Sequence, residues 1–298
     1  MFTLLRRWSA PPMAAFVALA LITTSRLSAQ EAATKLHALQ FEGHRVEYAV
    51  AGLDDPAAPT VVWIHGLGCR SDFWQPQVEV LAGEARLVLV DLIGHAGSDK
   101  PEIEYTMELY ARNVLAVMDA AGVDQAVLVG HSMGVPVVRE VARAASERVR
   151  AVLAVDGILT LLPIFKQFNG TVTQRFEGDA YEENFGAFVE TFFGDFATEE
   201  IREAVRSSML SAPQQMVLSS MRHMYDESVW RPVAIEAPIV SLMAGKAVLP
   251  PNYRTLHVEE FPQADYRTAE GAGHFVMLEA PETATQAVRD LLAASSEN

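Results

Sequence analysis

The sequence is poor in cysteine and contains no visible repeat or low-complexity segment. Cys69 is the only cysteine among 298 residues, so no disulfide can form within the chain and stability must come from a hydrophobic core. Half of the residues are apolar, which is enough for a sizeable core. A chain of this length accommodates one large α/β domain, or a core with a smaller inserted domain.

Basic residues are also scarce. The chain has 23 lysines and arginines against 38 aspartates and glutamates, which gives a formal net charge of −15. Residues 1–29 contain three arginines and no acid, so the chain without them would carry 20 basic and 38 acidic residues. A surface that acidic repels phosphate backbones and anionic membranes, which argues against nucleic acid as a partner.

The N-terminus lacks an apolar run of membrane-spanning length. Residues 13–22 form a short apolar segment after the arginine pair 6–7, and Leu-Ser-Ala at 27–29 resembles a signal-peptide cleavage site. A span needs about 20 apolar residues, so an uncleaved anchor is the less favoured alternative. We expect residues 1–29 to be a signal peptide and the mature chain to begin near Gln30. The protein would then be periplasmic or secreted, with no stable membrane anchor.

Strand-like and helix-like segments alternate along most of the chain. Several runs, among them residues 61–64 and 87–90, are continuously apolar, as are strands buried on both faces of a parallel sheet. The alternation predicts an α/β fold with a doubly wound, mostly parallel sheet. The expected strands are residues 46–50, 60–64, 86–91, 125–129, 149–156, 238–244 and 265–269, and the expected helices are 72–81, 107–121, 133–147 and 282–292.

Residues 157–233 break this alternation. They contain no buried strand pattern, only helix-like stretches rich in phenylalanine, and the interval is too long for a crossover helix. We interpret it as a helical lid inserted into a core of residues 30–156 and 234–298. We expect its phenylalanines chiefly to pack the lid against itself and the core, with lining of an apolar pocket as the alternative. They are Phe165, Phe168, Phe176, Phe185, Phe188, Phe192, Phe193 and Phe196.

The most informative stretch is residues 130–134, Gly-His-Ser-Met-Gly, which lies between a strand-like and a helix-like segment. A Gly-x-Ser-x-Gly motif in that position is typical of a nucleophile elbow. The tight turn strains the serine backbone, and the glycines avoid collisions with the neighbouring strand and helix. The hydroxyl is then exposed at a helix N-terminus, where backbone N–H groups can stabilise an oxyanion. Ser132 is therefore the candidate nucleophile.

Two glycine-rich loops accompany this motif. Residues 65–68, His-Gly-Leu-Gly, follow a buried strand, and the N–H of Leu67 with that of Met133 would form an oxyanion hole. Residues 271–275, Gly-Ala-Gly-His-Phe, follow the last strand and would hold His274 over the edge of the sheet. The serine thus lies mid-chain, and this histidine lies close to the C-terminus.

With these motifs the chain resembles the α/β-hydrolase family, in the lid-bearing branch that includes carboxylesterases and C–C bond hydrolases. The resemblance extends over residues 41–292. It includes residues 91–101, similar to the loop after the family's fourth strand, and Leu-Glu-Ala-Pro-Glu at 278–282. It implies that Ser132 is the nucleophile and that His274 takes its proton and later protonates the leaving group.

The other histidines are not needed for this chemistry. His65 is expected to support the oxyanion loop through hydrogen bonds, and His131 fills the variable position of the elbow. We expect His95, His223 and His257 on the surface or in the lid. No pair of histidines has metal-ligand spacing with a carboxylate nearby, so we predict neither a metal nor a cofactor.

The third member of the triad departs from the family pattern. Most relatives carry an aspartate in the loop after the strand that matches residues 238–244, and here that loop, 245–251, has no carboxylate. Loss of the orienting acid lowers the rate about 10⁴-fold in serine proteases. Some family members place the acid after the preceding strand, where this chain has Asp156, our preferred candidate. The alternatives are Asp265 or Glu270, or a triad that is degraded or reduced to a dyad.

These features predict an exported serine hydrolase that cleaves small-molecule carboxylic esters with small to medium apolar groups. Ser132 would carry the acyl group, the Leu67 and Met133 amides would hold the oxyanion, and Asp156 would orient His274. A serine at the elbow disfavours dehalogenases and epoxide hydrolases, which use an aspartate. Acyl transfer, perhydrolysis, lactone opening and C–C cleavage stay open, as does a ligand-binding protein that has lost turnover. The sequence does not predict the substrate-binding residues or the oligomeric state.

Overall fold

An eight-stranded sheet organises the described part of the chain, residues 34–247 and 249–296 of a computed structural model. The predicted signal peptide, residues 1–29, lies outside the described residues. The strand order is β1-β2-β4-β3-β5-β6-β7-β8; β2 runs antiparallel to both of its neighbours, β1 and β4, and all pairs from β4 to β8 are parallel. The strands are β1 (Lys35–Phe41), β2 (His44–Gly52), β3 (Thr60–Ile64), β4 (Arg86–Val90), β5 (Ala126–His131), β6 (Val149–Val155), β7 (Ile239–Ala244) and β8 (Ala264–Ala269).

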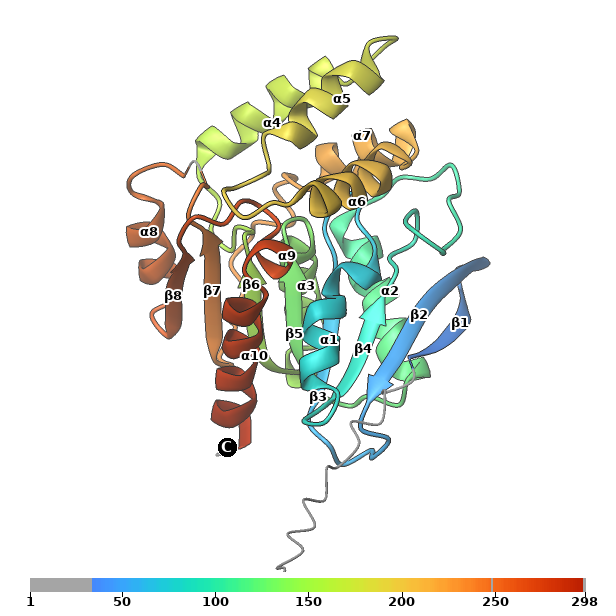
Figure 1. The fold of residues 1–298 in the computed structure, drawn as a ribbon, viewed down its shortest axis with the longest axis vertical. Helices are drawn as coiled ribbons and strands as arrows, with labels where there is room; N and C mark the ends of the chain where they lie inside the picture. The colour runs from blue at the N-terminus through green and yellow to red at the C-terminus, as the bar shows by residue number, and fades with distance from the viewer. Residues whose placement is uncertain (1–33, 248, 297–298) are drawn as a thin grey trace, which may run out of the picture. The chain divides into compact units, whose positions relative to one another are not determined.

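Helices cover both faces of this sheet (Figure 1). Helices α1 (Gln75–Leu81) and α10 (Pro281–Ser296) pack together on one face, and α2 (Met107–Ala120) and α3 (Gly134–Ala144) pack together on the other. The short α9 (Val276–Glu279) precedes α10, and α8 (Tyr253–Glu260) lies beside β8. Two single 3₁₀ turns, Ser71–Trp74 and Ser146–Arg148, complete the core elements. The arrangement confirms the predicted doubly wound α/β fold.

The predicted strands are all present because their burial matches the sequence pattern. Every residue of β3, β5 and β7 is buried, as the continuous apolar runs require. Strand β1 was not predicted, because its residues are mostly exposed and carry no apolar alternation. Nor were helices α8 and α9, which are only eight and four residues long. Short elements of this kind are fixed by the surfaces against which they pack.

The interval between β6 and β7 consists of four helices and no strand. They are α4 (Pro163–Arg175), α5 (Tyr181–Glu190), α6 (Glu199–Leu210) and α7 (Gln214–His223), and they gather at one end of the sheet (Figure 1). All four fall inside residues 157–233, the interval interpreted as a lid. The division of the chain into core and lid at those residues stays a prediction.

The carboxyl ends of β3 and β5 lie side by side at a topological switch point. The chain leaves β3 for β4 on one side and crosses back through α2 to β5 on the other side. Open α/β sheets bind their ligands in the crevice at such a point. The glycine-rich loop 65–68 and the elbow 130–134 follow these two strands, so the topology brings both motifs to the same crevice.

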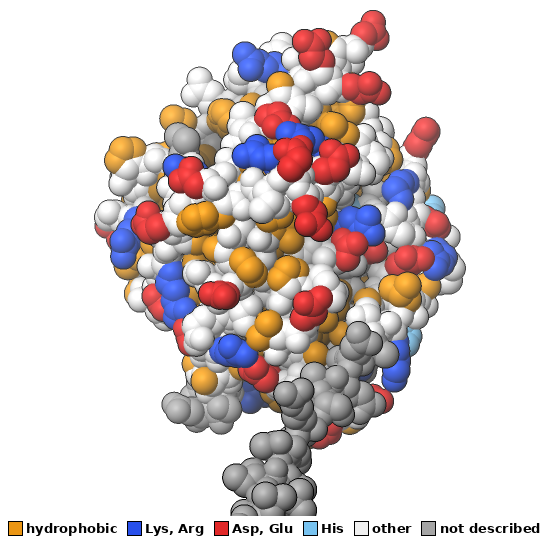
Figure 2. All heavy atoms as spheres, in the orientation of Figure 1, with side chains coloured by type: hydrophobic (Ala, Val, Ile, Leu, Met, Phe, Trp, Pro, Cys, Tyr) orange, Lys and Arg blue, Asp and Glu red, His pale blue; other side chains and the backbone are white. Residues whose placement is uncertain are grey.

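The surface carries charges of both signs. On the face shown in Figure 2, acidic and basic side chains are interspersed and do not gather into a patch of one sign. Among the helices that the structure describes, none is both long enough and apolar enough to cross a membrane.

Two glycines allow α3 to begin directly against the sheet. A Cβ atom on Gly130 would lie 2.6 Å from the carbonyl oxygen of Gly134, and one on Gly134 would lie 2.5 Å from the carbonyl oxygen of Ile64. Real Cβ atoms essentially never approach backbone oxygens so closely. The start of α3 is therefore held against the ends of β3 and β5: a side chain at Gly134 would push α3 away from β3, and one at Gly130 would push it away from β5.

We expect Gly134→Ala to lower the free energy of unfolding by about 1–3 kcal/mol, because the added methyl group must displace the β3 backbone. Gly170→Ala is the matched control, since a Cβ on this exposed residue of α4 would meet nothing within 4 Å. The control should stabilise the protein by roughly 0.5–1 kcal/mol. Urea denaturation measures both changes, and equal stabilities for the two variants would contradict the close packing.

Candidate active site

Ser132 occupies the strained turn that the elbow motif requires. It directly follows β5 and has a φ of 51°, in the left-handed region that residues other than glycine rarely adopt. Its N–H donates to the carbonyl oxygen of Val155 (3.0 Å), and its own carbonyl accepts from the N–H of Val135 (3.0 Å). The turn is thus fixed by β6 on one side and α3 on the other, which leaves the hydroxyl free to face the crevice.

The glycine-rich loop after β3 lies against the serine. A Cβ on Gly66 would be 3.0 Å from the Cβ of Ser132, so the two backbones are in direct contact. Leu67 is buried in this loop, and Met133 is the N-cap residue of α3. Neither the Leu67 nor the Met133 N–H donates to any residue that the structure describes. Two free amides beside a serine hydroxyl are what an oxyanion hole needs.

His65 holds the backbone of that loop. Its Nδ1–H donates to the carbonyl oxygen of Gly66 (2.8 Å), and its Nε2 accepts from the N–H of Leu92 (3.1 Å). A ring with a proton on Nδ1 and none on Nε2 is neutral. Burial lowers the pKa of His65, which favours this neutral form. The contacts match the expectation that His65 supports the loop through hydrogen bonds.

His274 is paired with Asp156. The Nδ1–H of His274 donates to Oδ2 of Asp156 (2.6 Å), and the other carboxylate oxygen accepts from the N–H of Ala244 (2.8 Å). Asp156 directly follows β6 with a φ of 39°, and only 7% of its side chain is exposed. The Nε2 atom of His274 has no hydrogen bond to a described residue and is free for proton transfer.

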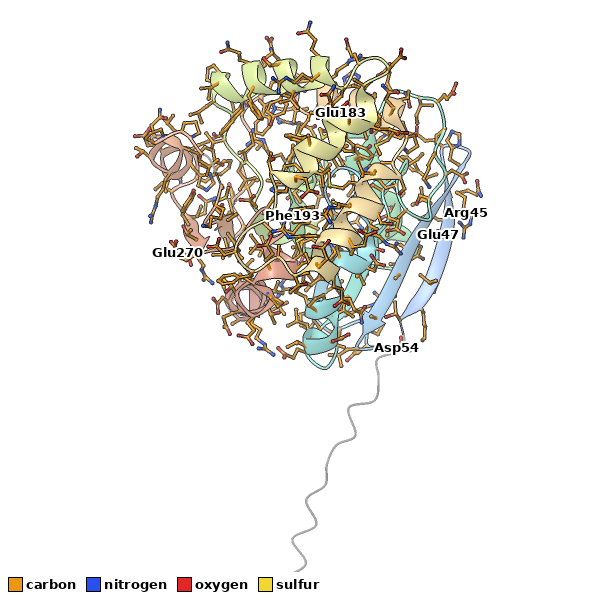
Figure 3. The ribbon with its side chains drawn as sticks, turned by 45° about the horizontal axis from the view of Figure 1, so that its top comes forward. Arg45, Glu47, Asp54, Glu183, Phe193 and Glu270 are labelled. Atoms are coloured by element: carbon orange, nitrogen blue, oxygen red, sulfur yellow. The ribbon has the colours of Figure 1, made fainter. Side chains whose placement is uncertain are left out.

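The other carboxylates considered from the sequence do not reach the histidine. Asp265 pairs with Arg267 (2.7 Å), and Glu270 is exposed just after β8 (Figure 3). The loop after β7, where most relatives carry the acid, presents Lys246, which pairs with Asp195 (2.9 Å). Among the described carboxylates, only that of Asp156 bonds to His274.

Ser132 and His274 both line a cavity of about 720 Å³. The described residues include no hydrogen bond between the two side chains, and such catalytic contacts are often long until substrate binds. The floor of the cavity comes from the ends of the parallel strands and the walls come from the four helices of residues 157–233. The structure therefore gathers Ser132, His274, Asp156 and Leu67 around one cavity.

The phenylalanines of residues 157–233 divide between the two expected roles. Phe168, Phe176, Phe188 and Phe192 line the cavity. Phe185 is buried behind them, with its ring 5.2 Å from that of Phe176. Pocket lining, the less favoured alternative, thus accounts for half of the set. Cys69, the single cysteine, is buried and also lines the cavity.

The segment after α5 holds the histidine loop, a contact that the sequence did not suggest. The N–H of His274 donates to the carbonyl oxygen of Phe192 (2.7 Å), and the two rings lie 4.5 Å apart. The buried carboxylate of Glu279 accepts from the N–H groups of Gly194 (3.1 Å) and Gly273 (2.9 Å). Phe193 (Figure 3), which follows Phe192 in the chain, stacks its ring on that of Phe275 (6.4 Å) and lies under the guanidinium of Arg202 from α6 (4.6 Å). No local pattern would have revealed these pairings.

His131 connects the elbow to the histidine loop. Its Nε2–H donates to the carbonyl oxygen of His274 (3.0 Å), and the two imidazole rings lie 4.7 Å apart. Burial holds the pKa of His131 well below the usual value of a histidine, so the ring is neutral. A neutral His131 places no second positive charge beside His274 when the latter takes a proton.

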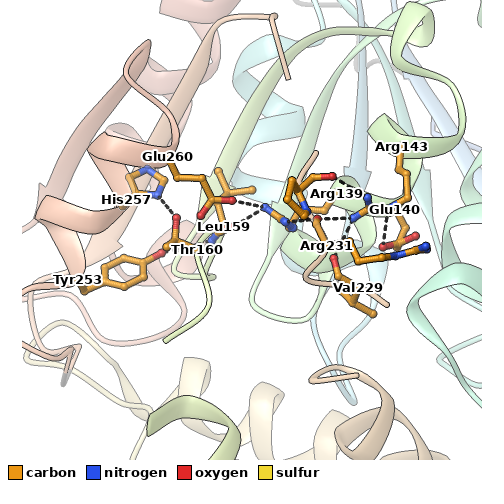
Figure 4. Close-up of polar contacts among 11 residues, drawn as sticks. Arg139, Glu140, Arg143, Leu159, Thr160, Val229, Arg231, Tyr253, His257 and Glu260 are labelled. Carbon is orange, nitrogen blue, oxygen red and sulfur yellow. Dashed lines mark hydrogen bonds and ion pairs between the residues drawn. The ribbon is translucent and has the colours of Figure 1, made fainter. Parts of the chain in front are cut away.

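The chain that leaves Asp156 is fixed by a buried polar network (Figure 4). The guanidinium of Arg139, on α3, donates to the carbonyl oxygens of Leu159 (2.6 Å) and Arg231 (3.1 Å) and pairs with Glu260 (3.3 Å). Arg139 thus joins α3 to both ends of the interval between β6 and β7. The network keeps the start of that interval in place beside the candidate acid.

His257 extends this network and is not where the sequence analysis expected it. It lies on α8, fully buried, between the hydroxyls of Ser241 (2.9 Å) and Thr160 (3.4 Å). His95 is also buried, so the expectation of a surface or lid position was wrong for both. His223 lies at the end of α7, as expected. Burial lowers the pKa of His257 to about 4.

No group of three or more histidine, cysteine, aspartate or glutamate side chains among the described residues is arranged to hold a metal ion. The prediction that the reaction uses neither metal nor cofactor stays a prediction.

Comparison with known proteins adds a family and a set of related folds. The model of the alpha/beta hydrolase family matches residues 61–287. An esterase from Thermogutta terrifontis superimposes with a TM-score of 0.73 at 24% identity, covering 88% of this chain and 99% of that one. An enol-lactonase from Burkholderia xenovorans gives a TM-score of 0.73 at 22% identity, covering 86% and 100%. These two likenesses establish the fold alone.

Among curated relatives, a haloalkane dehalogenase from Agrobacterium fabrum is 32% identical over 154 residues, which are 48% of this chain and 51% of that protein. The first matches of this kind cover between 28% and 61% of the relatives' own lengths. The shared part therefore defines a hydrolase scaffold, and what the whole chain acts on must be argued from its own site.

We expect Asp156→Asn to leave the protein folded but to lower turnover by two orders of magnitude or more, about 3 kcal/mol of barrier. The amide oxygen can still accept from Ala244, whereas the amide N–H₂ would face Nδ1 of His274 and reverse its tautomer. Ester turnover together with circular dichroism measures both effects. Asp265→Asn is the matched control, and a near-wild-type rate for Asp156→Asn would remove this residue from the triad.

We also expect the protein to lose stability as the pH falls from about 6.5 to 4. In that window the unfolded chain protonates His257, whereas the folded protein, with its lowered pKa, does not, so unfolding is favoured. The contribution is about 2 kcal/mol between pH 7 and 4.5. Urea denaturation at both pH values should show a smaller drop for His257→Gln than for the wild type. An equal drop in the two proteins would assign the acid sensitivity to other groups.

Proposed function

This chain belongs to the alpha/beta hydrolase family, and we propose that it cleaves carboxylic esters of small to medium apolar substrates through an acyl-enzyme on Ser132. The observation that carries the proposal is the bond between His274 and Asp156, which leaves Nε2 of the histidine free at the cavity that Ser132 lines. A histidine held in this tautomer can accept a proton from the serine hydroxyl.

In the proposed mechanism, Oγ of Ser132 attacks the acyl carbon while Nε2 of His274 takes the hydroxyl proton. The negative charge moves to the carbonyl oxygen, where the N–H groups of Leu67 and Met133 stabilise it. The C–O bond to the alcohol then breaks, and His274 returns the proton to the leaving oxygen. A water molecule then attacks the acyl-enzyme, and His274 takes its proton and returns it to Oγ of Ser132. This step releases the acid and restores the serine. Asp156 orients the imidazole and stabilises its charged form throughout.

The residue at the elbow separates this proposal from the reactions of some relatives. Dehalogenases and epoxide hydrolases of the fold use a nucleophilic aspartate, and this chain has Ser132 at that point. Lactone opening uses the same steps on a cyclic ester. Acyl transfer replaces water with another acyl acceptor, and C–C cleavage breaks a carbon–carbon bond in place of the C–O bond. A binding protein without turnover has no need for the free amides and the oriented His274 together.

The cavity wall supports the choice of apolar esters. Four phenylalanines line it from residues 157–233, together with Met209, Met221 and Met224. Aromatic and thioether side chains bind hydrocarbon groups without a fixed geometry. We propose that these helices act as a lid over the acyl or alcohol group of the substrate.

Export to the periplasm or the medium is a separate proposal that rests on residues 1–29. It is supported by the order of the arginine pair, the short apolar segment and the small-residue site at 27–29. N-terminal sequencing of the protein isolated from an expressing cell would give Gln30 as the first residue if this segment is removed.

The function is tested with a series of 4-nitrophenyl esters from acetyl to dodecanoyl. We expect turnover that is lost in Ser132→Ala by three orders of magnitude or more, and an optimum at short to medium acyl chains. Ser211→Ala, an exposed serine between α6 and α7, is the matched control and should retain the wild-type rate. Competing alcohols added to the same reactions would reveal acyl transfer as an ester product.

Turnover that survives Ser132→Ala would refute an acyl-enzyme at this residue. A folded wild-type protein without turnover on any ester would refute ester hydrolysis and favour C–C cleavage or ligand binding.

A further inference from the structure

Asn169 is a buried amide on the lid side of the cavity. It lies on α4 with 8% of its surface exposed, and it lines the cavity. Its Nδ2–H donates to the carbonyl oxygen of Met221 (2.6 Å). That carbonyl is among the last four of α7, which have no partner within their own helix. Asn169 is thereby held in one orientation.

The direction of this hydrogen bond fixes the other half of the amide. A carbonyl oxygen only accepts, so the N–H₂ group of Asn169 must face Met221 and Oδ1 must face away from it. No residue that the structure describes donates to Oδ1. Because this oxygen has no donor within the described protein, a water or a bound ligand in the cavity is left to supply one.

Tyr225 offers a second unused polar group to the same cavity. It lies just beyond the end of α7, and its ring is stacked on that of Trp230 (6.3 Å, 25°). Its hydroxyl has no hydrogen bond with a described residue. Burial raises the pKa of Tyr225 to about 12, so the hydroxyl keeps its proton and can donate.

The remaining polar side chains of the lid wall differ from these two. Nδ2 of Asn184 donates to the carbonyl oxygen of Arg175 (2.8 Å), and the hydroxyl of Thr191 donates to the carbonyl oxygen of Phe188 (2.7 Å). Thr191 and the Arg175 side chain are exposed, and Asn184 is partly exposed, so water serves them. Asn169 alone combines burial, a fixed orientation and a free acceptor.

We propose that Asn169 and Tyr225 select esters whose apolar arm carries a hydroxyl or a secondary amide. Such a group both donates and accepts, so it can donate to Oδ1 of Asn169 and accept from the hydroxyl of Tyr225. This assignment rests on the proposed ester hydrolysis and specifies the substrate class for the same cavity. Because the surrounding wall is apolar, an analogue that lacks the group leaves both side chains unpaired, which disfavours it.

The test compares 4-nitrophenyl octanoate with its monohydroxylated derivatives, one for each chain position of the hydroxyl, and with an isostere that has a secondary amide in the chain. The quantity measured is the ratio of kcat/KM for each polar ester to kcat/KM for the octanoate. We expect a ratio of about ten or more for at least one polar ester with the wild type. The hydroxyl and amide series together show which of the two groups is preferred.

The variants Asn169→Leu and Tyr225→Phe should each bring that ratio down several-fold. Gln167→Leu is the matched control, because it makes the same change at an exposed position of α4 that does not line the cavity, and it should keep the wild-type ratio. If the two side chains had only a structural role, the substitutions would change kcat/KM for the polar ester and for the octanoate together and leave their ratio unchanged. Tyr225→Phe removes one oxygen without a protein partner, so it decides the question even if Asn169→Leu does not fold.

A wild-type ratio near one for every polar ester would overturn the proposal, as would a ratio that survives in Tyr225→Phe. Failure of the proposed function has a different signature, namely no Ser132-dependent turnover on any ester of the panel. In that case, calorimetric binding of the uncleavable methyl ketones of the same chains, with and without the hydroxyl, still tests Asn169 and Tyr225. Equal affinities of the two ketones for the wild type would refute the assignment.

Discussion

The site depends on one carboxylate that joins the ends of three neighbouring strands. Asp156 follows β6, accepts from the N–H of Ala244 at the end of β7, and accepts from His274 in the loop after β8. The parallel sheet makes this convergence unavoidable, because all three strands finish at the same edge. With the acid on β6, the loop after β7 is free to carry Lys246 in its place, and the imidazole keeps its orienting partner.

Features of the fold and the site could be predicted from the sequence where they depend on neighbouring residues, and not where they depend on contacts between distant segments. The elbow and the glycine-rich loops were predictable, since tight turns need particular residues at adjacent positions and Ser132, His274 and Leu67 follow from them. Asp156 could be proposed only because the usual position was vacant; the sequence could not exclude Asp265 or Glu270, whereas the bond to His274 singles it out. The burial of His95 and His257 and the free oxygen of Asn169 depend on segments far apart in the chain, and no local pattern encodes them.

The segment between β6 and β7 forms walls of the cavity and also holds the loop that carries His274. The carbonyl oxygen of Phe192 accepts from the N–H of His274, and the carboxylate of Glu279 accepts from the N–H groups of both Gly194 and Gly273, so the segment after α5 is bound to the loop of the candidate histidine. Arg139 binds carbonyl oxygens near both ends of the interval between β6 and β7 and so ties them to α3, the helix that begins just after Ser132. Wall residues such as Asn169 are therefore positioned relative to Ser132 by buried hydrogen bonds, which a discriminating cavity requires.

The facing glycines, Gly194 and Gly273, have a consequence for recombining this fold with its relatives. A Cβ on either would collide with the backbone of the other, so the segment after α5 and the loop after β8 constrain one another at this point. A chimaera that exchanges all of residues 157–233 would separate this pair and displace the loop that carries His274, even if every helix folded correctly. Module boundaries drawn to leave residues 192–195 with the recipient would preserve the pairing, so these residues must be exchanged or kept together with the loop that carries Gly273.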